Sequence, residues 1–344
     1  MFLRSLLLAS GIPLLAAPCL AQDWPTVPFI EHATCQAVNA NGTSAYGGAF
    51  PIRLIGVVLN DTEDWLDPTP AYDPGVHPWQ MGGEAEFYVQ AVNLDGTAWD
   101  PAPGSAFDDF GGTACWMGQN YGNHGMHNDP VFSYTDAEWT AELGRLNLYG
   151  GDGATDPVRA GDLVEIRARV GLHYKGKMNV NEQQSNDPAN DFEIVRLLAG
   201  YGLPTPEPLS LADLKNPDDS ALFDATRQTG GERYQSSRVT LEDVHVTGAL
   251  PWTADSDITV TDGVRTFNVH LGLDAGFDGT PLFGAAERFN VTGILDQASS
   301  SGVYGTDGYQ LLAMDAADFT AVPEPAGLGL LVLGALSLRR RRRR

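Results

Sequence analysis

The residues best suited to metal chemistry gather in the segment NHGMHND at positions 123–129. His124 and His127 lie three residues apart, and Asp129 follows them. Two neutral imidazoles and a carboxylate suit Zn²⁺ or another divalent transition ion, which would need one or two further ligands from elsewhere in the chain. The alternative, which the glycine and asparagine content favours, is a polar surface loop without a metal.

Aspartate and asparagine residues recur at expected turns and form a second set of candidate ligands. Oxygen ligands of this kind suit Ca²⁺, but no segment completes an EF-hand loop, and the same residues are also the usual formers of turns. We therefore predict no obligatory cofactor, with Ca²⁺ and Zn²⁺ as the alternatives. The clusters are Asn93, Asp95 and Asp100; Asp152 and Asp156; Asp255, Asp257 and Asp262; and Asp274 and Asp278.

Motifs of nucleophilic and phosphate chemistry are absent from the sequence. It contains no G-x-S-x-G turn for a nucleophilic serine and no Walker-type phosphate loop. The sequence therefore predicts a protein that is not an enzyme, with a metal-dependent secreted hydrolase at His124 and His127 as the alternative.

The charge is distributed very unevenly. Between Gln22 and Ala321 there are 14 basic and 43 acidic residues, a net charge of −29, whereas seven of the 21 basic residues lie outside this range. Such a body repels polyanions, because binding to nucleic acid depends on lysine and arginine contacts to phosphates. The charge therefore argues against nucleic acid as a partner.

The N-terminal segment has the three parts of a secretory signal peptide. Arg4 precedes an apolar run over residues 6–17, and small residues precede the bond between Ala21 and Gln22. This pattern predicts export with cleavage at that bond. Two cysteines, Cys35 and Cys115, remain after cleavage, and in an oxidising compartment they are candidates for a disulfide. The sequence leaves open whether they pair or stay separate thiols.

The C-terminal segment also has three parts. Val322, Pro323, Glu324 and Pro325 come first, and an apolar stretch of 13 residues over 326–338 follows. The chain closes on the basic residues Arg339, Arg340, Arg341, Arg342, Arg343 and Arg344. The stretch is marginal for crossing a hydrocarbon layer about 30 Å thick, and the arginines would hold its end on the cytoplasmic side.

These three parts in this order resemble the PEP-CTERM sorting signal of bacterial exported proteins. The resemblance covers the last 23 residues. It implies recognition by an exosortase-type processing enzyme, transient anchoring in the membrane through the apolar helix, and delivery to the cell surface or an extracellular polysaccharide matrix. A plain C-terminal membrane anchor is the alternative.

The middle of the chain contains short β-runs separated by glycine and aspartate turns, which predict a mainly-β protein. The expected division is a signal peptide at 1–21, a first β-domain with long loops at 22–202, a linker with a short helix at 203–230, a second β-domain at 231–321 and the sorting signal at 322–344. Residues 134–146 are the best candidate for a helix. The expected strands are 52–59, 85–92, 113–117, 163–173, 192–198, 238–246, 258–261, 265–271, 288–295 and 309–314.

Both strand sets contain a late strand with an internal glycine, Gly171 in the first and Gly293 in the second. Strands bent in this way resemble the fourth strand of the OB-fold, a small Greek-key barrel. The resemblance implies two OB-like barrels in tandem, with a β-sandwich as the alternative. Together with the two end segments, it predicts a non-enzymatic structural or binding module outside the cell, for which an exopolysaccharide is the candidate ligand.

Overall fold

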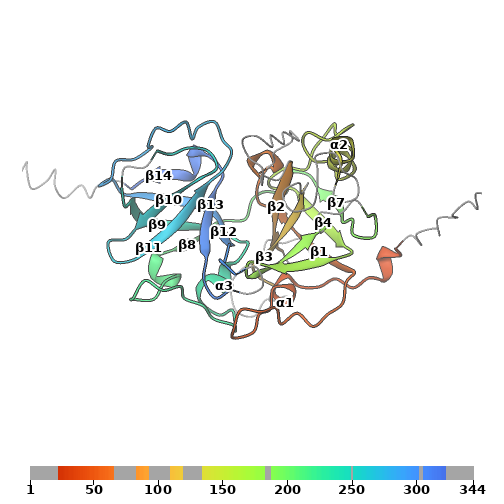
Figure 1. The fold of residues 1–344 in the computed structure, drawn as a ribbon, viewed down its shortest axis with the longest axis horizontal. Coiled ribbons are helices and arrows are strands. Elements are labelled where there is room, and N and C mark those ends of the chain that lie inside the picture. Colours follow the sequence, from red (N-terminus) through yellow and green to blue (C-terminus); the bar gives the residue numbers. More distant parts are fainter. Residues whose placement is uncertain are drawn as a thin grey trace, which may run out of the picture.

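The computed structural model describes residues 22–65, 83–92, 109–118, 134–182, 187–248, 251–301 and 305–322. These residues fold into two β-structured lobes that lie side by side (Figure 1). The expected mainly-β class is confirmed, and the two lobes are the expected tandem small barrels.

The first lobe has one sheet with the strand order β5-β6-β3-β2-β1-β4-β7. All neighbouring strands are antiparallel except β3 and β6, which are parallel. The strands are β1 (Ile52–Val58), β2 (Glu84–Ala91), β3 (Gly112–Gly118), β4 (Leu163–Ala168), β5 (Gly171–Tyr174), β6 (Lys177–Asn181) and β7 (Glu193–Leu198). The helical elements are η1 (Trp24–Thr26), α1 (His32–Cys35), η2 (Thr62–Trp65) and α2 (Asp136–Arg145).

The first sheet closes through β4 and β5. Only Arg169 and Val170 separate these two strands, yet β4 pairs with β1 and β5 pairs with β6. One bent strand therefore runs between the two sides of the sheet, as the fourth strand of an OB barrel does. Gly171 begins the second half of the bend, where a Cβ atom would lie 2.2 Å from the ring of Phe50.

The second lobe is a closed barrel of five strands with one additional strand on each side. The order is β14-β12-β13-β11-β10-β9-β8, and a further pairing of β12 with β9 completes the ring. The parallel pairing of β11 with β13 matches that of β3 with β6 in the first lobe. The elements are β8 (Glu207–Leu209), η3 (Leu211–Asp213), α3 (Gly230–Tyr234), β9 (Arg238–Val246), β10 (Ser256–Thr261), β11 (Thr266–Leu271), β12 (Phe289–Gln297), β13 (Tyr309–Ala313), η4 (Ala316–Asp318) and β14 (Phe319–Ala321).

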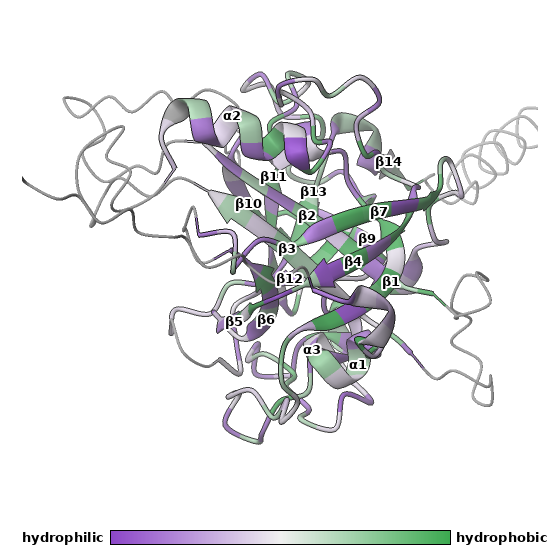
Figure 2. Ribbon diagram, turned by 90° about the vertical axis from the view of Figure 1, so that its right-hand side faces the viewer, coloured by the Kyte–Doolittle hydropathy of each residue, from purple (hydrophilic) through white to green (hydrophobic). Residues whose placement is uncertain are grey.

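Each barrel has its own apolar core, because alternate residues of each strand point inward. Figure 2 shows hydrophobic and hydrophilic residues alternating along the strands. Phe87, Val89 and Ile166 are among the fully buried residues of the first core, and Val260 and Phe289 are among those of the second. Helix α2 lies within the expected helix 134–146 and begins with a capping box made by Thr135 and Glu138.

Gly293 sits where β12 changes partner from β9 to β13, and it gives a direct test of barrel closure. A Cβ atom there would lie 2.3 Å from the backbone oxygen of Leu312. We expect Gly293→Ala to lower the free energy of unfolding by about 1–3 kcal/mol, the usual cost of overpacking. Urea unfolding measures this loss. Gly248→Ala is the control, since nothing lies within 4 Å of that position. An equal loss of stability in the two variants would contradict the role of Gly293 as a tight point of barrel closure.

Two expectations for the order of elements need correction. The last strand of the first barrel is β6, which lies between the expected strands 163–173 and 192–198 where no strand was expected, whereas β7 is an additional strand beside β4. The segment 203–230, expected to be a linker, forms β8 and places Leu209, Leu211 and Leu214 in the second core. It is therefore part of the second barrel.

The signal segment and nearly all of the sorting segment lie outside the described residues. Val322 is the last described residue, and its N–H donates to the carbonyl of Arg288 at 3.0 Å. Among the described residues, no helix has the length and apolar character needed to cross a membrane.

Candidate functional site

The residues predicted to bind zinc, His124, His127 and Asp129, lie outside the described residues, as do Ala21 and the sorting residues from Pro323 onward. The structure therefore neither brings these residues together nor separates them. Their roles stay predictions from the sequence.

Cys35 and Cys115 are free thiols in the structure, so the disulfide that the sequence leaves open is not formed there. Both are fully buried in the core of the first barrel. Burial raises the pKa of Cys35 to about 12, and it also raises the pKa of Cys115. Because the thiolate is the reactive form of cysteine, neither residue is suited to act as a nucleophile at neutral pH.

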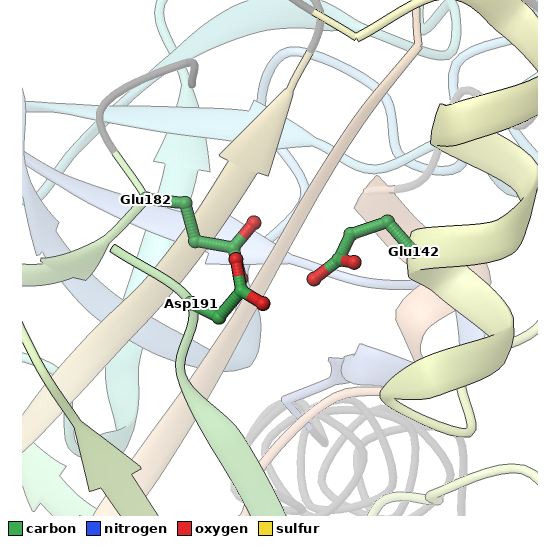
Figure 3. Close-up of side chains that lie close together, drawn as sticks. All are labelled: Glu142, Glu182 and Asp191. Carbon is green, nitrogen blue, oxygen red and sulfur yellow. The ribbon is translucent and has the colours of Figure 1, made fainter. Parts of the chain in front are cut away.

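The structure brings together three carboxylates that sequence reasoning did not single out. Glu142 is on α2, Glu182 directly follows β6 and Asp191 precedes β7, and one oxygen of each lies within 4.8 Å of the others (Figure 3). Within the described part of the chain, this is the one group of three possible metal-ligating side chains so close together. We call it the acidic cluster.

Arg145, one turn further along α2, supplies positive charge to the acidic cluster. Its Nε donates to Glu142 at 2.6 Å, its Nη2 donates to Glu182 at 3.0 Å, and its Nε lies 3.7 Å from Asp191. Tyr134 donates its hydroxyl proton to the second oxygen of Glu182 at 2.7 Å. Donors of the protein itself thus occupy the cluster, and a metal ion would have to compete with Arg145.

Burial also favours the protonated form of the acidic cluster. Burial, together with the charge of Glu142, raises the pKa of Glu182 to about 8, and burial likewise raises the pKa of Asp191. A proton on Glu182 and the charge of Arg145 together offset two of the three negative charges. The arrangement is therefore suited to holding α2 against the barrel, and divalent-cation binding would require loss of that proton first.

The free energy of unfolding should fall as pH rises from 6.5 to 8. Burial is the largest cause that raises the pKa of three carboxyl groups. It raises the pKa of Glu182 to about 8 and the pKa values of Asp64 and Glu232 to about 7. The folded state then holds protons that the unfolded chain has already released, so stability is lost as pH rises through these values. His32, whose pKa burial lowers from 6.5, acts in the opposite direction only below that pH.

Urea unfolding at several pH values checks this expectation. Glu182→Gln keeps the shape of the side chain and removes its titration, so the variant should lose less stability than the wild type over the same range. A stability that rises between pH 6.5 and 8 would contradict the assignment of these carboxyl groups.

The two barrels meet through an apolar seam. It consists of Leu59, Tyr88 and Ala114 from the first barrel and Ile294 and Leu312 from the second, all buried. Tyr88 and Ala114 are on the outer face of β2 and β3, the equivalents of strands two and three of an OB-fold. This is the face on which OB-folds bind oligonucleotides and oligosaccharides, and in this chain the second barrel covers it.

Within the part of the chain that the structure describes, the corresponding face of the second barrel, on β10 and β11, is not covered in this way. Its outward residues Asp257, Thr259 and Asn268 are partly or largely exposed. His270 on this face hydrogen-bonds through Nδ1 to Asp257 at 2.7 Å, and its ring stacks on Trp65 of the first barrel with centroids 5.0 Å apart. The face thus offers amide, hydroxyl and carboxylate groups beside one indole ring.

No protein-family model and no curated protein matches the chain. Two solved structures with 11% identity align with most of it. One is a murine DNA-binding protein bound to double-stranded DNA, with a TM-score of 0.29 over 76% of this chain and 92% of that one. The other is a deletion mutant of the single-stranded DNA-binding protein from Thermus aquaticus, with a TM-score of 0.18 over 79% of this chain and 95% of that one. Likenesses this slight carry no argument about function.

Proposed function

We propose that this chain is an exported protein of the cell surface or extracellular matrix, and that its two barrels form a non-enzymatic structural or binding module. One observation carries the proposal: the motif at 322–325, the apolar stretch at 326–338 and the arginines at 339–344 follow the body in the order of a PEP-CTERM signal. The leader at 1–21 supports export from the other end of the chain.

The body supports a structural or glycan-related role more than nucleic-acid binding. Its charge of −29 over residues 22–321 opposes polyanions. In addition, the outer face of β2 and β3 is buried against the second barrel. Burial of this face applies equally to a glycan, but a neutral or cationic glycan is not repelled by the charge, and an exopolysaccharide of the producing cell is the partner we propose. If that polysaccharide does not retain the protein in a pull-down, the binding role fails and only the structural role remains.

Variants of the tail test the sorting part of the proposal in the native cell. Replacing Pro323, Glu324 and Pro325 with alanine should stop processing, so that the uncut chain stays in the membrane fraction. Deletion of residues 339–344 should remove the stop that holds the tail in the membrane. Arg288→Met is the control, because it removes an exposed arginine of the body. Unchanged delivery to the surface in both tail variants would refute the sorting role.

A further inference from the structure

Next to Tyr88 of the seam, a lysine and an aspartate from different barrels are buried against each other. Lys177 is the first residue of β6, and Asp296 is near the end of β12. Nζ of Lys177 contacts Oδ1 of Asp296, and the two side chains are only 9% and 4% exposed. Charged side chains are almost never buried to this degree unless they are paired. The contact therefore joins the two barrels in a place from which water is largely excluded.

Three further polar groups surround this pair. Glu86 of β2 places Oε1 3.4 Å from Nζ of Lys177, and Tyr88 places its hydroxyl oxygen 3.3 Å from the same atom. On the other side, the amide of Gln310 donates to Oδ2 of Asp296 at 3.3 Å. The amine thus has a second carboxylate beside it, and the carboxyl group of Asp296 has a hydrogen-bond donor on the oxygen that faces away from the amine.

As an ion pair, this contact is costly to bury, because both groups give up their hydration. Burial alone would lower the pKa of Lys177, but the charges of Asp296 and Glu86 outweigh it and raise the pKa. The ammonium form therefore dominates before any reaction, and a reaction needs a base next to Nζ. Glu86 occupies that position.

We propose that Lys177 and Asp296 condense into an isopeptide bond that links the two barrels covalently, with Glu86 as the catalytic proton carrier. Nothing else in the seam combines an amine, a carboxyl carbon and a neighbouring base among the described residues. The proposal goes beyond export and surface sorting, because the bond would form wherever the chain folds.

The atoms balance without any other reactant. Glu86 takes one proton from the ammonium group, and the freed lone pair of Nζ attacks Cγ of Asp296. The C–N bond forms, and the Gln310 amide stabilises the negative charge that develops on Oδ2. The bond between Cγ and Oδ1 then breaks, and Oδ1 leaves as water with the proton from Glu86 and a second proton from Nζ. One proton stays on the amide nitrogen, and nothing is oxidised or reduced.

The fold supplies what this reaction lacks in free solution. Holding two reacting groups in contact corresponds to an effective molarity of about 10⁵–10⁸ M in well-oriented cases. The product is neutral, so it removes two charges from the dry seam, and the excluded water disfavours hydrolysis. The bond would also restrict the unfolded chain, as a disulfide between positions 119 residues apart would.

Mass spectrometry of the purified full chain tests the proposal. The wild type should be lighter than its processed sequence by one water molecule, and protease digestion should release a branched peptide that joins Lys177 to Asp296. Lys177→Arg keeps the positive charge but cannot form this amide, and Glu86→Gln removes the base, so both variants should have the full mass. Lys175→Arg, two residues away, is the matched control and should retain the water loss.

The mass of the wild type alone decides whether the isopeptide bond forms, even where a variant fails to fold. A full mass for the folded wild type, or a water loss that maps elsewhere in the chain, would overturn the bond. A branched peptide that persists in Glu86→Gln would overturn the role of Glu86.

Discussion

Replacing Arg145 with methionine should lower the free energy of unfolding by about 3 kcal/mol, the lower end of the cost of removing one partner from a buried ion pair. Glu182 is fully buried, whereas Arg145 is 31% exposed, so solvent limits the loss. Without the guanidinium, the acidic cluster would have no positive charge beside its carboxyl groups. Urea unfolding at neutral pH measures the change.

The same variant should recover stability as the pH is lowered towards 5, because protonation of the carboxyl groups removes their repulsion. Arg288→Met is the control: this arginine is 44% exposed and pairs with an exposed aspartate, so its loss should cost no more than about 0.5 kcal/mol. An Arg145→Met variant as stable as the wild type at neutral pH would show that the acidic cluster does not depend on this charge.

Truncating Leu312 to alanine should also cost about 3 kcal/mol, within the range of about 2–5 kcal/mol for a leucine buried in a close-packed interior. Its neighbour Leu311 points into the second barrel, whereas Leu312 points into the seam, where it meets Tyr88 and Ile294. The substitution should therefore weaken the contact between the barrels rather than the core of either one. Thermal and urea unfolding should show a less cooperative transition than in the wild type, since each barrel keeps its own core.

Leu282→Ala provides the comparison for this second substitution, because Leu282 is 38% exposed and lies outside the seam. Its removal should change the free energy of unfolding by about 0.5 kcal/mol or less. If Leu312→Ala proves as mild as Leu282→Ala, the seam contributes little to holding the barrels together.

Strand periodicity and turn residues were enough to locate most of the barrel strands, because their inward side chains are apolar. The strand β9 occupies the predicted residues 238–246. Gly171 and Gly293, the internal glycines at which the sequence predicts bent strands, lie at the bends of the two barrels. The missed strand, β6, has the sequence KMNVN. Its Met178 and Val180 enter the core, but its outward residues are polar and are buried by neighbouring parts of the fold.

The acidic cluster could not be read from the sequence for a different reason. Glu142 and Glu182 are 40 residues apart in a chain with 44 acidic residues, so no local pattern marks them as neighbours. The contact of Lys177 with Asp296 spans two barrels and depends on how the barrels pack. Only the closed topology and the packing of the two barrels bring these groups together, whereas the predictions for the two end segments rest on local sequence patterns and need no fold.

The central claim is that the body of this chain works outside the cytoplasm, and the location and ends of the mature chain in its own cell test it most directly. Fractionation followed by mass spectrometry of the terminal peptides should find the protein outside the cytoplasm with a chain that begins at Gln22. A chain recovered from the cytosol with residues 1–21 and the arginines at 339–344 still attached would contradict the account.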